Sequence, residues 1–254
     1  MPLPFETALV TGGASGLGRA TARHLAGLGA RVVVLDLNAE RAEQTAAEFG
    51  GIGIGADVGN PEAVAAAFAA ATQALGSAPR IVVNCAGIGT AARILPRDGG
   101  LPIAEFERTL RINLIGTYSV LSHAAQGMST LEPLADGARG VIINTASVAW
   151  QDGQIGQAAY AASKGGIASL TLPAARELAR FGIRVMAIAP GLFETAMTQT
   201  LPEEVRSAIS ANIPFPSRLG APEEYALLVE QIVTNPFLNG TVIRLDGAVR
   251  LQPR

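Results

Sequence analysis

Thr11-Gly12-Gly13-Ala14-Ser15-Gly16-Leu17-Gly18 follows a short apolar run, Thr7–Thr11, and leads into a stretch typical of a helix, Leu17–Leu28. A Gly-rich turn between a strand and a helix lets the backbone approach a pyrophosphate, which the free N–H groups and positive dipole end of the helix attract. An ordinary strand-to-helix turn is the alternative, and the placement of the glycines favours dinucleotide binding. The residues expected to hold a cofactor here are Gly12, Ser15, Gly16, Leu17 and Gly18.

Outward from this turn, short β-branched runs alternate with Ala-rich helical stretches. The expected strands are Thr7–Thr11, Arg31–Leu35, Gly53–Ala56, Ile81–Asn84, Gly140–Thr145, Arg184–Ala189 and Val242–Leu245. The expected helices are Leu17–Leu28, Ala39–Phe49, Pro61–Leu75, Ile103–Met128, Ala158–Phe181 and Pro222–Thr234. Such alternation implies right-handed crossovers between parallel strands. We therefore predict a single-domain, doubly wound α/β Rossmann fold over residues 1–254, with a seven-stranded parallel sheet and helices on both faces.

Two segments depart from this alternation. Gly89–Leu101 is rich in Gly and Pro, and Gly191–Ser217 is long and interrupted by three prolines. Long irregular segments on a rigid scaffold are often lids or substrate loops. We expect residues 191–217 to form a lid over the substrate.

Composition excludes several classes of function. The 254 residues carry a net charge of −2, and 49% of them are apolar. This balance argues against a nucleic-acid partner, and the absence of any apolar run of about 18 residues argues against a membrane span. Cys85 is the single cysteine, so neither a disulfide framework nor a Cys-rich metal site is expected. No signal-peptide pattern is seen, so a cytoplasmic protein is expected. No metal is expected either.

Asp36 ends the second expected strand and indicates which dinucleotide binds. A carboxylate at this position can accept hydrogen bonds from the adenosine ribose and would repel a 2′-phosphate. No Lys or Arg stands in the Gly-rich turn or at Leu37 and Asn38 to attract that phosphate. NAD is therefore favoured over NADP. The alternative role for Asp36 is a helix N-cap, which Asn38 fits better.

Further candidate residues lie where the third and fourth strands end. Asp57-Val58 and Asn84-Cys85-Ala86-Gly87 stand at carboxyl ends of strands, where open α/β sheets bind ligands. Cys85 is interpreted as a packing residue near the cofactor, because no His–Cys pairing can be recognised. His24 and His123 lie in helical patterns and are interpreted as structural.

The only lysine, Lys164, follows Tyr160 by four residues, and the other eighteen of the 19 Lys and Arg residues are arginines. Residues i and i+4 share a helix face, so the ammonium can lie beside the phenol. A compact, rotatable ammonium suits a ribose hydroxyl better than the planar fork of Arg does. A surface tyrosine and a surface lysine are the alternative.

Ser147 follows the fifth strand, thirteen residues before Tyr160. Together with Thr11–Gly18, Asn113 and Pro190-Gly191, these residues form the pattern of the short-chain dehydrogenase/reductase family, which the chain resembles over its whole length. Gly156-Gln157-Ala158-Ala159-Tyr160 and the stretch from Pro214 to Gly220 are most similar to family members that act on 3-hydroxyacyl-CoA.

The resemblance implies a catalytic set of Asn113, Ser147, Tyr160 and Lys164, with Ser147 and Tyr160 contacting the substrate. Tyr160 would be the general base toward a hydroxyl, or the acid in reverse, and Lys164 with the positive nicotinamide ring would favour its phenolate. Lys164 would also hold the nicotinamide ribose, and Ser147 would hydrogen-bond the substrate oxygen. Asn113 would hold a water that links Lys164 to solvent, with helix packing as its alternative role.

The resemblance also implies the remaining contacts to NAD and a substrate. The expected contacts are Ser15, Leu17, Asp36, Asp57, Val58, Cys85, Ala86, Gly87, Tyr160, Lys164, Pro190, Gly191, Phe193 and Thr195. A 3-hydroxyacyl-CoA is the expected substrate; a hydroxysteroid, another secondary alcohol, or a non-catalytic NAD-bound scaffold are the alternatives. A carrier-protein reductase would generally need NADPH, which Asp36 disfavours. The family also implies a homotetramer, and small residues in Ala158–Ala168 would permit close helix contacts.

Overall fold

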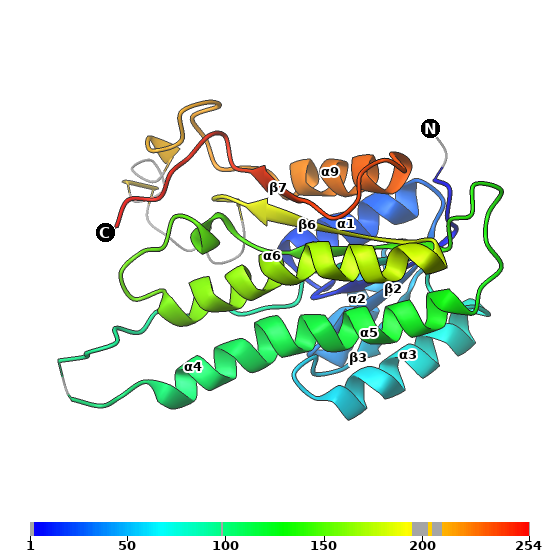
Figure 1. Ribbon diagram of the computed structural model, residues 1–254, viewed down its shortest axis with the longest axis horizontal. Coiled ribbons are helices and arrows are strands. Elements are labelled where there is room, and N and C mark those ends of the chain that lie inside the picture. Colours follow the sequence, from blue (N-terminus) through cyan, green and yellow to red (C-terminus); the bar gives the residue numbers. More distant parts are fainter. Residues whose placement is uncertain (1–2, 98, 195–202, 205–209, 254) are drawn as a thin grey trace.

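A seven-stranded sheet runs through the middle of the molecule (Figure 1), in the order β3-β2-β1-β4-β5-β6-β7, and every neighbouring pair is parallel. The strands are β1 (Thr7–Thr11), β2 (Arg31–Asp36), β3 (Ile52–Gly55), β4 (Ile81–Asn84), β5 (Gly140–Thr145), β6 (Ile183–Pro190) and β7 (Val242–Leu245). This computed structural model describes residues 3–97, 99–194, 203–204 and 210–253. The strand order reverses between β1 and β4, which creates the crevice where doubly wound sheets bind ligands.

Helices cover both faces of the sheet (Figure 1). They are α1 (Gly16–Gly27), α2 (Ala39–Ala47), α3 (Pro61–Leu75), α4 (Ile103–Leu110), α5 (Gly116–Ser129), α6 (Ala158–Leu178) and α9 (Pro222–Thr234). Alternate residues of β1 separate the two cores: Val10 packs with α1, α2 and α9, whereas Leu9 packs with α3, α5 and α6. Burial on both faces explains why the strands are continuously apolar. The predicted doubly wound Rossmann fold is confirmed.

The predicted helix Ile103–Met128 differs from the observed structure. A five-residue π-helical segment, η1 (Arg111–Ile115), separates α4 from α5. Asn113 lies in this wider turn, and its side chain is hydrogen-bonded to both backbone groups of Ile88. Such π segments are often found at functional sites. Apolar periodicity runs through the segment unbroken, so the sequence pattern did not reveal it.

The predicted lid falls largely outside the described residues, because residues 195–202 and 205–209 are not described. Its two ends are described. Phe193 and Gly220 pair as an isolated parallel bridge, and Ile213 packs with Leu219 and Val249. No helix within the described ranges is long and apolar enough to cross a lipid bilayer.

Candidate active site

A cavity of about 740 Å³ opens at the carboxyl ends of the strands. It brings together residues that are far apart in the sequence. The predicted residues that line it are Gly12, Ser15, Gly16, Leu17, Gly18, Asp36, Asp57, Val58, Cys85, Ala86, Gly87, Ser147, Tyr160, Lys164, Pro190, Gly191 and Phe193. Thr195 lies outside the described residues. Asn113 is fully buried behind the cavity.

The Gly-rich turn forms a backbone-lined cradle at one end of the cavity. Gly12 has a φ of 61°, and a Cβ there would lie 2.8 Å from the backbone nitrogen of Ala86. A Cβ at Gly18 would overlap the carbonyl oxygen of Gly12. Ser15 is the N-cap of α1, and its side chain makes no capping hydrogen bond. Because side chains are excluded and N–H groups of the first helical turn are free, the cradle fits the pyrophosphate of a dinucleotide.

Asp36 is held at the end of β2 by the same turn. Its Oδ2 accepts a 3.1 Å hydrogen bond from the backbone nitrogen of Ala14, and its Oδ1 accepts one of 3.2 Å from Asn38. Asn38 is the N-cap of α2, since its side chain accepts a 3.0 Å bond from the backbone nitrogen of Arg41. The N-cap alternative for Asp36 is therefore excluded, and its carboxylate lines the cavity.

Ser147 and Tyr160 meet at the other end of the cavity. Ser147 precedes the 3-10 turn η2 (Val148–Trp150), where its Oγ accepts a 3.2 Å bond from the backbone nitrogen of Ala149. Tyr160 lies in the first turn of α6, and its phenol is hydrogen-bonded to the Ser147 side chain. A substrate oxygen placed between these two hydroxyl groups would contact both.

Lys164 lies one turn further along α6, with Nζ 5.7 Å from the centroid of the Tyr160 ring. Nζ donates a 2.7 Å hydrogen bond to the carbonyl oxygen of Thr145, the last residue of β5. Burial lowers the pKa of Lys164 to about 8, because a desolvated ammonium is disfavoured. The pair predicted from the i, i+4 spacing is thus a buried lysine beside a partly buried tyrosine, and the surface alternative is wrong.

The pKa of Tyr160 is raised above its ordinary value. Burial is the main cause, and the hydrogen bond to Ser147 partly offsets it. The sequence led us to expect that Lys164 would help to lower this pKa. In the structure desolvation dominates, so the protein's own residues favour the protonated phenol at neutral pH.

The side chain of Asn113 anchors the segment that follows β4. Its Oδ1 accepts a 2.8 Å bond from the backbone nitrogen of Ile88, and its Nδ2 donates to Ile88 O at 2.9 Å and to Ser163 Oγ at 3.1 Å. A Cβ at Gly87 would lie 3.1 Å from that Oδ1 and 3.7 Å from Lys164 Nζ. Asn113 therefore lies directly behind Gly87, between the cavity wall and α6.

A buried polar cluster near the cavity was missed by the sequence reasoning. The hydroxyl of Thr145 lies 2.6 Å from Asn84 O and 2.7 Å from the phenol oxygen of Tyr225 on α9. Cys85 contacts both hydroxyl groups, and burial raises its thiol pKa to about 11, which fits a packing residue. The only available signal was a threonine two residues before Ser147. No sequence pattern indicates that Asn84 and Tyr225 are the hydrogen-bond partners of Thr145.

Both histidines have structural contacts, as predicted. His24 Nε2 lies 2.7 Å from Glu230 Oε2, which joins α1 to α9. The ring of His123 stacks on Phe68 at a centroid distance of 5.8 Å, which joins α5 to α3. Neither histidine lines the cavity.

The fold, the glycine cradle and the Ser147–Tyr160–Lys164 cluster together define a short chain dehydrogenase, and the chain belongs to that family: residues 6–206 match it. The chain is 52% identical to 3-hydroxyacyl-CoA dehydrogenase type-2 from Bos taurus and from Homo sapiens, over 97% of this chain and 95% of each relative. It is 35% identical to the (3R)-3-hydroxyacyl-CoA dehydrogenase of Homo sapiens, over 95% of this chain and 94% of that protein.

A solved structure agrees with these similarities. The crystal structure of 3-hydroxyacyl-CoA dehydrogenase type-2 from Mycobacterium avium superposes with a TM-score of 0.92 at 42% identity, and 98% of each chain is covered. The protein is therefore an oxidoreductase of the dehydrogenase type. Membership of this family implies a nicotinamide cofactor and a small-molecule substrate.

Proposed function

We propose that this enzyme interconverts 3-hydroxyacyl-CoA and 3-oxoacyl-CoA with NAD(H) as its cofactor. The observation that carries the substrate class is the 52% identity, over 97% of the chain, to relatives named 3-hydroxyacyl-CoA dehydrogenase type-2. When bound, the oxidised nicotinamide would supply the hydride acceptor and a positive charge beside Tyr160.

The chemistry at the substrate hydroxyl is assigned to Ser147 and Tyr160. In the oxidation Tyr160 takes the hydroxyl proton, and in the reduction it returns that proton to the oxygen. Ser147 donates a hydrogen bond to the same oxygen and stabilises the negative charge that develops there. The hydrogen bond between the two side chains supports this assignment, because both hydroxyl groups can face one substrate atom.

Lys164 is assigned two tasks. Its ammonium would bind the ribose hydroxyls next to the nicotinamide, and with the nicotinamide charge it would lower the cost of forming the Tyr160 phenolate. The position of Nζ, 5.7 Å from the Tyr160 ring and within the cavity wall, supports both tasks. Asn113 would support Lys164 from behind Gly87, by holding a water or by fixing the backbone after β4.

Asp36 is assigned the choice of NAD over NADP. Two backbone N–H groups orient its carboxylate toward the cavity, where it would accept hydrogen bonds from the adenosine ribose. A 2′-phosphate in the same place would be repelled. Asp57, Val58, Cys85 and Phe193 would line the remaining length of the cofactor.

We propose that the chain is one NAD-binding domain and that its segment 191–217 closes over the substrate. We also propose that the enzyme acts in the cytoplasm as a homotetramer. On α6 a Cβ at Gly165 would meet nothing within 4 Å, whereas one at Gly166 would meet Leu114 at 2.7 Å. The position of Gly165 on α6 therefore leaves room for a close contact with another subunit. Light scattering of the purified protein tests the tetramer, and a monomer would reject it.

The test of the function is NADH absorbance at 340 nm with both enantiomers of 3-hydroxybutyryl-CoA and, in reverse, with acetoacetyl-CoA. A hydroxysteroid and a simple secondary alcohol serve as rival substrates. We expect the CoA pair to be turned over fastest, at least about tenfold better with NAD(H) than with NADP(H). Activity on the steroid or alcohol alone would reject the acyl-CoA assignment, and no turnover at all would favour an NAD-bound scaffold.

A further inference from the structure

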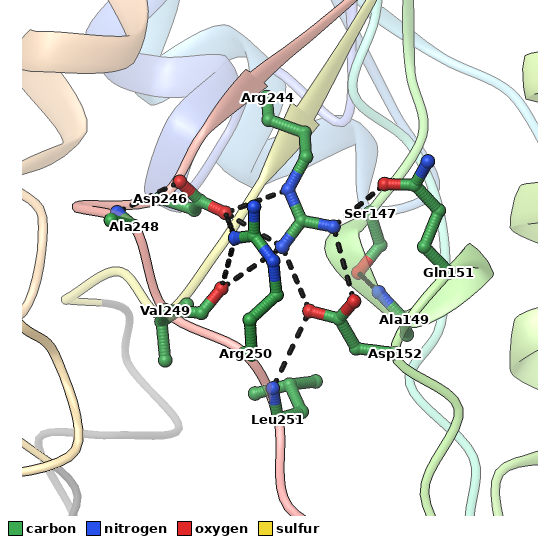
Figure 2. A network of polar contacts seen from close by, with 10 residues as sticks. All are labelled: Ser147, Ala149, Gln151, Asp152, Arg244, Asp246, Ala248, Val249, Arg250 and Leu251. Carbon is green, nitrogen blue, oxygen red and sulfur yellow. Dashed lines mark hydrogen bonds and ion pairs between the residues drawn. The ribbon is translucent and has the colours of Figure 1, made fainter.

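A partly buried ion cluster is centred on Arg244 of β7, and Figure 2 shows it between Ser147 and Leu251, which both line the cavity. Its Nη2 is 2.7 Å from Asp152 Oδ2 and 2.7 Å from Asp246 Oδ2, and the three side chains are only 19%, 10% and 9% exposed. Hydrogen bonds from Arg244 lower the pKa of Asp152, so the carboxylate stays ionised. Neither exposed nor buried ion pairs gain much net stability, so the importance of this cluster lies in the geometry that it fixes.

On one side, Arg244 is hydrogen-bonded to the turn that follows Ser147. Its Nη1 donates 2.7 and 3.2 Å hydrogen bonds to Gln151 Oε1 and Asp152 Oδ1. The backbone nitrogens of Gln151 and Asp152 both donate to Val148 O, so this turn is continuous with Ser147. Figure 2 shows Ser147 and Asp152 on the same short stretch of ribbon.

On the other side, the cluster holds the C-terminal strap, which we define as residues 249–253. Arg244 Nη2 donates a 3.0 Å bond to Val249 O, and Asp152 Oδ2 accepts a 3.4 Å bond from the backbone nitrogen of Leu251. Two further bonds join the strap to the segment before α6: Ile155 N to Pro253 O at 3.0 Å and Gln154 Nε2 to Gln252 O at 2.9 Å. Leu251, Gln252 and Pro253 are thus each hydrogen-bonded to the Ser147–Tyr160 segment, and Val249 is hydrogen-bonded to Arg244.

Leu251 is the residue of the strap that lines the cavity. Ser147, Gln154 and Leu192 line the same cavity. Leu251 also packs on a small apolar cluster formed by Ile213, Leu219 and Val249. The backbone bond of Leu251 to Asp152, five residues after Ser147, holds this apolar side chain in the wall of the cavity that Ser147 also lines.

We propose that Leu251 determines substrate size and that Arg244 is the positioning residue that holds it against the Ser147 turn. This inference rests on the proposed function, since it assigns part of the substrate pocket of that same site. The segment of an acyl chain beyond the reacting carbon would meet Leu251. Loss of Arg244 would release the strap and the Ser147 turn together.

The first experiment compares wild type with Leu251→Ala and Arg244→Met on a ladder of 3-hydroxyacyl-CoA substrates of increasing chain length. Arg218→Met is the matched control, because it removes an exposed ion pair with Glu224 outside this cavity. We expect Leu251→Ala to raise kcat/KM for the longest chain relative to the shortest by at least about fivefold, with the Kd of NADH unchanged. Arg244→Met should shift the ratio in the same direction and also lower kcat. An unchanged ratio in Leu251→Ala overturns the proposal.

A second readout does not depend on turnover. In Arg244→Met, hydrogen exchange of backbone amides should be faster than in wild type in two segments, residues 249–253 and residues 151–155. If Arg244→Met does not fold, Asp152→Asn takes its place and should show the same change. Arg218→Met should change neither segment. Equal exchange in wild type and variants overturns the role of Arg244.

If the wild type turned over no acyl-CoA, the proposed function would fail. The same comparison with linear secondary alcohols of increasing chain length would then decide the role of Leu251.

Discussion

The ammonium of Lys164 donates a 2.7 Å hydrogen bond to the carbonyl oxygen of Thr145. Thr145 ends β5, and Ser147 follows two residues later. The same strand end therefore positions both the cation beside Tyr160 and the hydroxyl that is hydrogen-bonded to it. A displacement of β5 would move both groups, which makes this strand end the geometric origin of the site.

Lys164 should cost stability in a way that depends on pH. Its pKa is about 8 in the folded protein and 10.5 ordinarily, so between these values the unfolded chain binds more protons and stability rises with pH. Lys164→Met removes this cost. Its stability relative to wild type should be greatest below pH 8 and should decline by up to about 3 kcal/mol as pH approaches 10.5. Urea unfolding of both proteins at several pH values measures this, and a difference independent of pH would contradict it.

The two directions of the reaction should differ in pH dependence. The pKa of Tyr160 is raised, so the phenol remains a proton donor through neutral pH. Reduction of acetoacetyl-CoA should therefore be steady near neutrality, whereas oxidation should quicken as pH rises and the phenolate forms. Profiles of kcat/KM against pH in both directions test this. Oxidation that is insensitive to pH from about pH 6 to pH 10 would argue against Tyr160 as the base.

Cofactor selectivity should depend on Asp36. Asp36→Ala should lower kcat/KM with NAD by about 10- to 100-fold, the equivalent of losing hydrogen bonds to a charged group. Asp36→Asn retains an acceptor oxygen without the charge, so it should recover part of the NAD activity while tolerating NADP. Initial rates with both cofactors measure the ratio. If both variants kept the wild-type preference for NAD over NADP, Asp36 would not be the residue that sets cofactor selectivity.

Two glycines of α1 provide a matched pair. A Cβ at Gly18 would collide with the carbonyl oxygen of Gly12, whereas one at Gly27 would meet nothing within 4 Å. Gly18→Ala should distort the cradle and weaken NADH binding by at least about tenfold. Gly27→Ala should leave binding unchanged and stabilise the protein by about 0.5 kcal/mol. Fluorescence titration with NADH measures the effect on binding, and thermal unfolding measures the effect on stability. If both variants bound NADH equally well, the Gly-rich cradle would not be the pyrophosphate site.

Much of the fold could be predicted because its strands are short apolar runs with clear ends. The bounds predicted for β1, β4, β5 and β7 match the observed ones, and the other three strands differ by one residue at one or both ends. The π-helical segment at Asn113 could not be predicted, because the apolar pattern reflects neither the wider turn nor the hydrogen bonds of Asn113 to Ile88.

The cofactor side of the site was accessible from sequence because its residues follow directly on strand ends. The protein's own residues raise the pKa of Tyr160, mainly through burial; the degree of that burial depends on the packing of the whole pocket, which the sequence does not reveal. The Arg244 cluster gave no signal either. Asp152 and Arg244 are 92 residues apart, so no local sequence pattern links them.

The most direct test of the central claim is NADH formation at 340 nm from 3-hydroxybutyryl-CoA and NAD⁺ by wild type and Tyr160→Phe, with NADH binding measured alongside. We expect steady turnover by wild type and a loss of at least about 100-fold in Tyr160→Phe, with NADH bound equally by both. Turnover by Tyr160→Phe within a few-fold of wild type would contradict the assignment of Tyr160 as the proton-transferring residue. Absence of wild-type turnover would contradict the proposed substrate.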